Sequence, residues 1–174
     1  MPYFRNTTIQ GVTYELDHLD PFTFPFFVDD ENFIVSVEFT NHCFTEKREP
    51  RHTPDHHYTS RCKNGEQRTF SPQRFEDSKL LPNMIKTLGN ASVYHTDRES
   101  FFFMRTAQGD QYLVFFRAYK STKEGVDVRL NINSAYRKPR MTQRASPVKF
   151  TNLVKSTAQS LPLTAGPKAR ISRG

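Results

Sequence analysis

The sequence has no tryptophan, only two cysteines and no long apolar segment. Two cysteines, Cys43 and Cys62, are too few for a disulfide scaffold, and the opening residues MPYFRNTT do not resemble a secretory leader. Free thiols in a reducing compartment are therefore the favoured state, with a Cys43–Cys62 disulfide as the alternative. The apolar runs are only a few residues long, which is too short to cross a membrane. We predict a cytoplasmic protein that has no membrane segment.

Several well-defined catalytic motifs are also missing. The chain has no G-x-x-x-x-G-K-[ST], G-x-G-x-x-G, H-E-x-x-H or G-x-S-x-G. Glycine is scarce, with seven residues in 174, so a glycine-rich loop that cradles phosphates is not expected. These absences exclude nucleotide hydrolysis by a P-loop.

Acidic residues are scarce in the second part of the chain. Residues 101–174 hold fourteen Lys and Arg against three Asp and Glu, a net +11, whereas residues 1–100 hold eleven against fifteen, a net −4. A basic segment of this kind favours a polyanion as partner. Two alternatives stay open: the two halves attract each other, or the basic residues form a solvated surface.

Alternation and turn signals predict an α+β fold. Sixteen Phe and seven Tyr indicate an aromatic core. Residues 33–40 alternate as a strand, Ser71-Pro72 begins a helix that Pro82 kinks and Gly89 ends, and period-two strands follow from Ala91 to a last strand over 147–154. We predict an antiparallel meander of four to five strands packed against one kinked helix, with an additional N-terminal strand. Residues 1–155 would form one domain, and residues 156–174 a flexible basic tail.

Two further segments are harder to assign from local patterns. Residues 22–28 contain Pro25 and follow Pro21, which predicts an edge strand or a loop. Residues 45–69 are polar and contain Pro50 and Pro54, which predicts a long loop or a poorly ordered hairpin.

The strand 126–133 and the loop after it form the candidate nucleic-acid-binding surface. Its outward positions carry Arg and Asn, and a Tyr and more basic residues follow. Cations suit the phosphate backbone, and an aromatic ring suits a stacked base. The predicted binding residues are Arg129, Ser134, Arg137, Lys138, Arg140 and Arg144. The structural alternative is a solvated hairpin end.

The candidate catalytic residues are His42, His95, Arg74 and Tyr136. Metal-free RNA cleavage needs a base for the 2′-hydroxyl, an acid for the leaving oxygen and cations for the phosphorane charge. The two histidines would move protons, Arg74 would hold phosphate, and Tyr136 would stack or donate a hydrogen bond. The structural alternative is that each histidine caps a strand end. This chemistry requires neither a cofactor nor a metal.

A third group has the residue types of a zinc site. Its members are Cys43, His52, His56, His57 and Cys62. Their spacing matches no standard finger or ribbon, because the chain contains no C-x₂-C pair. A histidine-rich loop without metal is the favoured interpretation, and a Cys43 nucleophile with a His partner is a weaker alternative.

The segments VEFTNHCFT, RTFSPQRFEDSKLLPNMIKTL, VYHTDRESFFFM and VRLNINSAYRK resemble small bacterial or phage-borne proteins. The helix followed by a curved meander resembles the barnase–EndoU–colicin–RelE group of RNase toxins. The resemblance covers about residues 33–152. It implies catalytic or binding roles for the matching residues Arg74, His95, Ser134, Tyr136 and Arg137.

The leading functional prediction is a nucleic-acid-targeting, toxin-like protein, most concretely a metal-independent endoribonuclease. RNA is the favoured partner, and an acidic protein such as an antitoxin is another. The first alternative is a non-enzymatic nucleic-acid-binding or regulatory module. The second is a protein-interaction module that acts as an inhibitor or adaptor.

Overall fold

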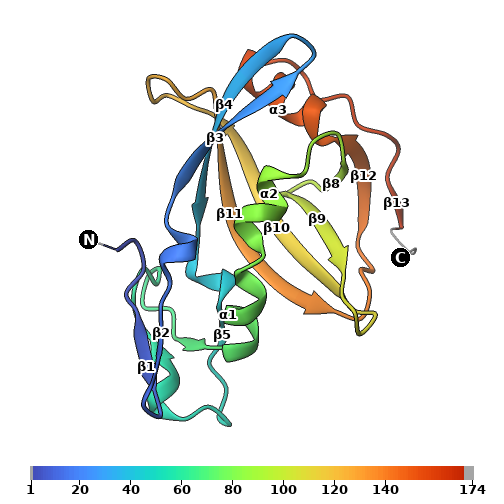
Figure 1. The fold of residues 1–174 in the computed structure, drawn as a ribbon. Coiled ribbons are helices and arrows are strands. Elements are labelled where there is room, and N and C mark those ends of the chain that lie inside the picture. Colours follow the sequence, from blue (N-terminus) through green and yellow to red (C-terminus); the bar gives the residue numbers. More distant parts are fainter. Residues whose placement is uncertain (1, 171–174) are drawn as a thin grey trace.

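One large twisted sheet dominates the computed structural model, which describes residues 2–170 (Figure 1). Its strands are ordered β12 (Arg144–Lys149), β8 (Ser92–His95), β9 (Ser100–Arg105), β10 (Gln111–Lys120), β11 (Val128–Lys138), β4 (Glu31–Phe39) and β3 (Phe22–Val28). A short eighth strand, β13 (Ala169–Arg170), pairs with β12 at one edge. Neighbouring strands are antiparallel except for β11 and β4, which are parallel.

The predicted fold class is wrong in its sheet. The sheet is mixed and has seven strands besides β13, rather than an antiparallel meander of four or five. The difference arises because β4 is not an accessory strand: Val35–Phe39 pairs with Val128–Ile132 and brings the β3–β4 hairpin into the same sheet. A parallel pairing between such distant segments leaves no local turn signal in the sequence.

The predicted last strand over 147–154 is wrong after residue 149. Strand β12 ends at Lys149, and helix α3 (Phe150–Gln159) begins at the next residue. Phe150, Leu153 and Val154 are buried, and their spacing is that of one helical face. Of the predicted flexible basic tail over 156–174, residues 156–159 belong to this helix, residues 169–170 form β13, and residues 171–174 lie outside the described part of the chain.

The predicted kinked helix consists of two short helices, α1 (Pro72–Ser78) and α2 (Leu81–Lys86). The Ser71 side chain caps α1 by accepting a hydrogen bond from the Arg74 backbone N–H at 3.4 Å. The helix is interrupted at residues 79–80, next to Pro82, which confirms the break predicted there.

Smaller elements complete the chain. Strands β1 (Thr7–Ile9) and β2 (Val12–Tyr14) form a hairpin, and β5 (Thr45–Lys47), β7 (Arg68–Phe70) and β6 (His57–Tyr58) form a three-stranded sheet. The single-turn helices are η1 (Asp17–Leu19), η2 (Asn41–Cys43) and η3 (Pro54–His56). The segment predicted as a long loop or hairpin thus contains β5 and β6. Strand β3 lies at the sheet edge with Pro25 exposed, so the edge-strand interpretation of residues 22–28 is confirmed.

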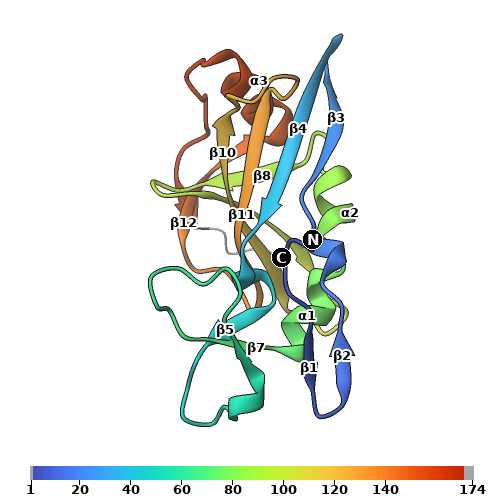
Figure 2. The ribbon, with the colours of Figure 1, turned by 90° about the vertical axis from the view of Figure 1, so that its left-hand side faces the viewer.

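The main core lies on the side of the sheet that the helices cover (Figure 2). Phenylalanine rings meet there edge to face, as Phe26 and Phe150 do with centroids 5.1 Å apart. Among the described residues, the opposite side carries a smaller apolar cluster of Phe101, Leu113, Phe115, Met141 and Ala145. Within residues 2–170, no helix has both the length and the apolar character needed to span a membrane.

Candidate functional site

The polar side of strands β4, β11 and β10 forms what we call the open face. On this side of the sheet, Ser36 of β4 pairs with Arg129 of β11, which pairs with Tyr119 of β10. Glu38 pairs in the same way with Asn131, which pairs with Arg117. Thr40 follows β4 on the same side, because side chains alternate along a strand. A β-bulge between Phe115 and Phe116 turns both Asn133 and Ser134 away from the main core. The face therefore combines cations, amides and hydroxyls on one side of a sheet that the helices leave uncovered.

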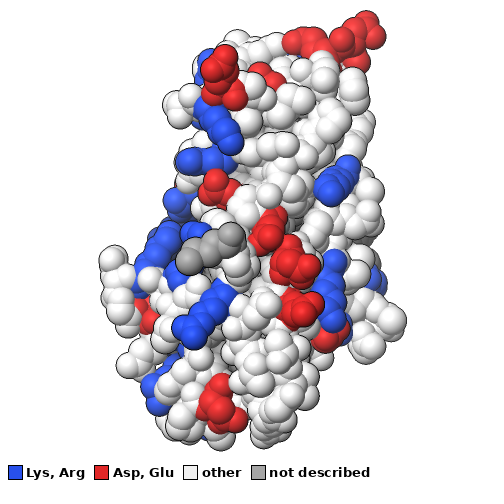
Figure 3. Space-filling view, turned by 60° about the vertical axis from the view of Figure 1, so that its left-hand side comes forward, with Lys and Arg blue, Asp and Glu red and all other residues white. Residues whose placement is uncertain are grey.

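Six Lys and Arg residues line the hollows of this surface, and one of them, Lys120, donates to Ser160 Oγ at 3.1 Å. The other five, which we call the open-face cations, are Arg61, Lys63, Arg117, Lys123 and Arg129. Among residues 2–170, none of their charged nitrogens lies within 4.0 Å of a carboxylate oxygen. Arg117 instead donates to the Arg98 carbonyl at 3.0 Å, and Arg61 donates to the Tyr3 carbonyl. Figure 3 shows many of the Lys and Arg side chains down the left side of the visible face, with Asp and Glu side chains among them and at its middle, top and bottom.

The first of two hollows in this surface is the dyad hollow, of about 280 Å³. His42 and Glu66 line it, with His42 Nε2 lying 3.1 Å from Glu66 Oε2. Both side chains are 36% exposed, so solvent and a ligand can reach them. Burial raises the pKa of Glu66, but the hydrogen bonds and charges of His42 and Arg68 outweigh it and leave that pKa below its ordinary value. A neutral His42 that donates from Nε2 to Glu66 would keep a free lone pair on Nδ1.

Local structure holds His42 in place. The Thr40 side chain caps η2 by accepting from the His42 backbone N–H at 3.3 Å, and its own hydroxyl donates to the Asn133 carbonyl at 2.6 Å. Asn133 in turn donates to Glu99 Oε2 at 2.9 Å. The dyad hollow is thus anchored to the bulged strand β11.

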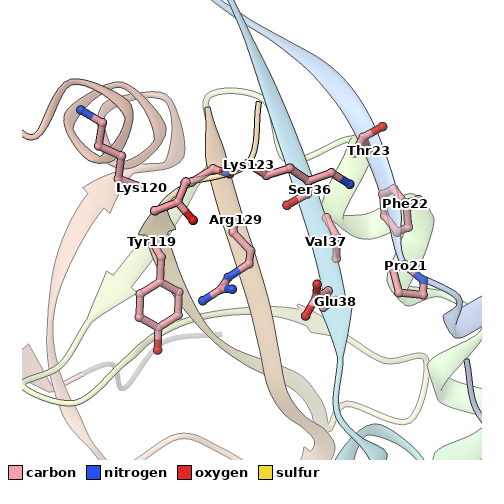
Figure 4. A pocket seen from close by; sticks show the side chains of 12 residues that line it. Pro21, Phe22, Thr23, Ser36, Val37, Glu38, Tyr119, Lys120, Lys123 and Arg129 are labelled. Atoms are coloured by element: carbon pink, nitrogen blue, oxygen red, sulfur yellow. The ribbon is translucent and has the colours of Figure 1, made fainter. Parts of the chain in front are cut away.

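The second hollow, the upper hollow, measures about 520 Å³ and lies where β4 passes β11 and the β10–β11 loop (Figure 4). Arg129 and Lys123 bring positive charge to it, and Glu38 brings a carboxylate. In the view of Figure 4, the Arg129 guanidinium lies between the Tyr119 ring and Glu38, and Lys123 extends across β4 toward Thr23. The guanidinium carbon is 5.1 Å from the Tyr119 ring centroid, a cation–π distance.

The predicted catalytic residues fall in separate places. His42 lies in the dyad hollow, but His95 lies at the end of β8 with its Nδ1 3.0 Å from Ser100 Oγ. Four interstrand steps separate His95 from β4. They follow the register pairs His95–Ser100, Ser100–Phe116, Phe116–Ile132 and Ile132–Phe39. At the usual spacing between strands, these steps span about 19 Å along the sheet. The paired residues are also on the helix-covered side. The structure therefore does not bring the two histidines together.

Arg74 and Tyr136 do meet, although not in either hollow. The Arg74 guanidinium carbon is 5.2 Å from the Tyr136 ring centroid, and Arg74 donates to the Thr45 carbonyl at 2.7 Å. Burial lowers the pKa of Arg74 and raises that of Tyr136. This arrangement fastens α1 to the sheet.

The predicted nucleic-acid-binding residues are likewise divided. Only Arg129 lines a hollow. Ser134 lies on the bulge opposite Phe115, while Arg137 is paired with Asp77 at 2.6 Å. Lys138, Arg140 and Arg144 are exposed at the far end of β11, in the loop after it and at the start of β12.

The candidate zinc ligands do not gather. Over residues 2–170 there is no group of three or more His, Cys, Asp or Glu side chains placed to hold a metal ion. Cys43 is buried with Sγ 3.8 Å from the Ile132 carbonyl, Cys62 Sγ lies 3.2 Å from the Tyr58 carbonyl, and His52 bonds Glu46 at 2.8 Å. His56 contacts Thr53, and His57 lies in β6.

Sequence reasoning missed most of the open face. Arg117 and Tyr119 alternate outward at the end of β10, and the alternation in QYLVFFRAY is the signal that indicates this. The partner of His42 is Glu66, which comes from the polar segment before β7. No local pattern indicates that contact.

The fold and this surface define a sheet-rich α+β protein with a polar, cationic face. A family model matches residues 6–158, and the chain belongs to the YjaZ family. No curated protein and no solved structure matches the chain.

Proposed function

We propose that the open face binds the phosphate backbone of a single-stranded nucleic acid, with RNA as the favoured partner. The observation that carries this proposal is the placement of five cations on or beside an uncovered sheet face, none of them in an ion pair with a described carboxylate. Unpaired Arg and Lys can neutralise successive phosphates and release counterions. Cations already held by the protein's own acids would have to exchange partners first.

The neighbouring side chains favour an unpaired strand over a duplex. The Tyr119 ring is 37% exposed and offers a surface on which a base can stack. Asn131 and Ser36 offer amide and hydroxyl groups beside Arg129, and such groups can bond a ribose 2′-hydroxyl or a base edge.

Both cysteines are free, which supports a cytoplasmic protein.

A salt titration tests the binding proposal. Fluorescence anisotropy with a labelled single-stranded RNA should give a log–log plot of affinity against salt with a clearly negative slope. Arg117→Gln should reduce that slope by about 0.7, as expected when one phosphate contact to a single strand is lost. Arg105→Gln, an exposed arginine on β9, is the matched control and should leave the slope unchanged. Salt-independent binding, or equal effects of the two variants, would refute the proposal.

A second candidate function is metal-independent RNA cleavage in the dyad hollow. The specific observation is the His42–Glu66 contact beside Arg61, Lys63 and Arg117. His42 Nδ1 would take the proton of the 2′-hydroxyl as the 2′-O–P bond forms and the P–O5′ bond breaks. The leaving 5′ oxygen would take a proton from water or from Lys63, while the arginines stabilise the phosphorane charge.

Cleavage of RNA in the presence of EDTA tests this candidate. We expect His42→Ala to reduce cutting by about 100-fold or more, in line with the loss of a general base, and to retain RNA binding. His95→Ala is the control and should cut normally, because His95 lies far from the dyad hollow. Cutting that survives in His42→Ala, or binding without any cutting by the unmodified protein, would exclude an enzyme that uses this dyad.

A further inference from the structure

The upper hollow has features that backbone binding alone does not require. Arg129 and Glu38 line it together, yet they do not form an ion pair with each other. We propose that this hollow is a subsite for one nucleoside phosphate, either a free mononucleotide or one nucleotide of a bound strand. The inference rests on the proposed function for the class of ligand and is tested separately from it.

The phosphate would lie between Arg129 and Lys123. Both side chains come from β11 and the loop that precedes it, and neither has a carboxylate within 4.0 Å among the described residues. A guanidinium binds two phosphate oxygens at once, and an ammonium adds a second point charge. Two cations in one hollow therefore favour a phosphate over a neutral ligand.

A planar ring would lie against the aromatic side of the hollow. Tyr119 is partly exposed, and Arg129 lies over its ring, so the pair offers a flat surface at the mouth. Pro21, Phe22 and Val37 supply an apolar wall. The volume of about 520 Å³ is within the range of roughly 300–1,000 Å³ that small-ligand pockets occupy.

Glu38 would give the subsite its selectivity. Its carboxylate makes no hydrogen bond or ion pair with any other described side chain or backbone group. An ionised carboxylate only accepts hydrogen bonds, and it repels a second phosphate. It therefore favours a ligand that carries N–H or O–H donors beside its phosphate, as the exocyclic amine of a base or the ribose hydroxyls do.

Calorimetry with three small ligands tests the subsite. Adenosine 5′-monophosphate should bind at least tenfold more tightly than either adenosine or inorganic phosphate, because it alone engages both ends of the hollow. Arg129→Gln should weaken nucleotide binding by about tenfold, as expected for a lost charged hydrogen bond, and should weaken adenosine binding much less, because adenosine has no phosphate to lose a partner. Arg105→Gln is again the control.

Glu38→Ala separates the subsite from a simple anion site. In this variant inorganic phosphate should bind as well as or better than before, while the advantage of the nucleotide over phosphate should shrink by about tenfold. Equal affinities for nucleotide and phosphate in the unmodified protein would overturn the inference, and so would an unchanged preference in Glu38→Ala.

The two proposals fail in different ways. If single-stranded RNA does not bind but the mononucleotide does, with dependence on Arg129 and Glu38, the subsite stands and the open-face proposal falls. If RNA binds with dependence on Arg117, and the mononucleotide neither binds nor competes, the subsite falls and the open-face proposal stands.

Discussion

Arg137 and Asp77 join the main sheet to helix α1 through two parallel hydrogen bonds. Arg137 Nε donates to Asp77 Oδ2 at 2.9 Å, and its second terminal nitrogen donates to Asp77 Oδ1 at 2.6 Å. The Asp77 side chain is 6% exposed and the Arg137 side chain 31%. A residue that we predicted to bind nucleic acid is thus engaged in holding the fold. The basic second half of the chain is divided between such contacts and the open face.

We expect Arg137→Ala to lower the free energy of unfolding by about 2–3 kcal/mol. The change leaves the Asp77 carboxylate buried without its cation, and Arg137 is itself partly exposed, which moderates the loss. Urea denaturation followed by circular dichroism measures it. Lys138→Ala, at the next and exposed position, is the control and should change stability by less than about 0.5 kcal/mol. Loss of RNA binding in Arg137→Ala without loss of stability would show that the residue acts at a ligand.

Arg74 gives a second prediction of the same kind. Its guanidinium donates to the Thr45 carbonyl at 2.7 Å and lies over the Tyr136 ring. Arg74→Met keeps much of the side-chain volume but removes the donor and the charge, so we expect a loss of about 1–3 kcal/mol in unfolding free energy. RNA affinity, measured by anisotropy on the folded variant, should stay within twofold. A large loss of affinity at unchanged stability would place Arg74 at a functional site.

The sequence indicated individual elements better than their arrangement. Ser71, Pro72 and Pro82 signalled the start and break of the α1–α2 segment because capping and proline geometry are local effects. The pairing of β4 with β11 was not predictable in this way, because its register depends on contacts between Val35–Phe39 and Val128–Ile132. Phe150 was assigned to a strand because PVKF alternates, although its partners Leu153 and Val154 follow a helical spacing.

The candidate site shows the same limit. His42 and Arg129 could be identified from residue type, since a histidine after a strand and an outward arginine on a strand both suggest chemistry. Which residues they meet depends on the tertiary fold: Glu66 reaches His42 from another segment. The same fold separates His95 from His42, so residue types alone suggested a pair that the sheet keeps apart.

The two cysteines should differ sharply in reactivity. Cys43 is fully buried, and burial raises the pKa of its thiol to about 12. Burial also raises the pKa of Cys62, but this residue is partly exposed, with Sγ 3.2 Å from Asn41 Nδ2 and from the Tyr58 carbonyl. At pH 8 a chromogenic disulfide reagent should modify one thiol per chain, more slowly than a free thiol, and the second only after denaturation. Cys62→Ser should abolish the native-state reaction; rapid modification of two thiols would contradict the buried position of Cys43.

Alkaline pH should destabilise the protein between about pH 9 and pH 12. Burial raises the pKa of Cys43 from 9.0 to about 12 and that of Tyr58 from 10.0 to about 12, and it also raises the pKa of Tyr112. In this window the unfolded chain releases protons that the folded chain keeps, so stability is present below pH 9 and is lost as pH rises toward 12. Each such group lowers the free energy of unfolding by about 1.4 kcal/mol per pH unit while its unfolded form is ionised and its folded form is not.

Urea titrations at pH 8, 9, 10 and 11 on the unmodified protein and on Cys43→Ala isolate one of these groups. At pH 8 the variant should be less stable, because it loses buried volume. Above pH 9 its free energy of unfolding should fall less steeply than that of the unmodified protein, by the contribution of one proton. Lysines and exposed tyrosines titrate in both proteins and cancel in the comparison. Parallel stability curves for the two proteins would mean that the Cys43 thiol ionises as readily in the folded chain as in the unfolded one, contrary to its burial where η2 packs against β11.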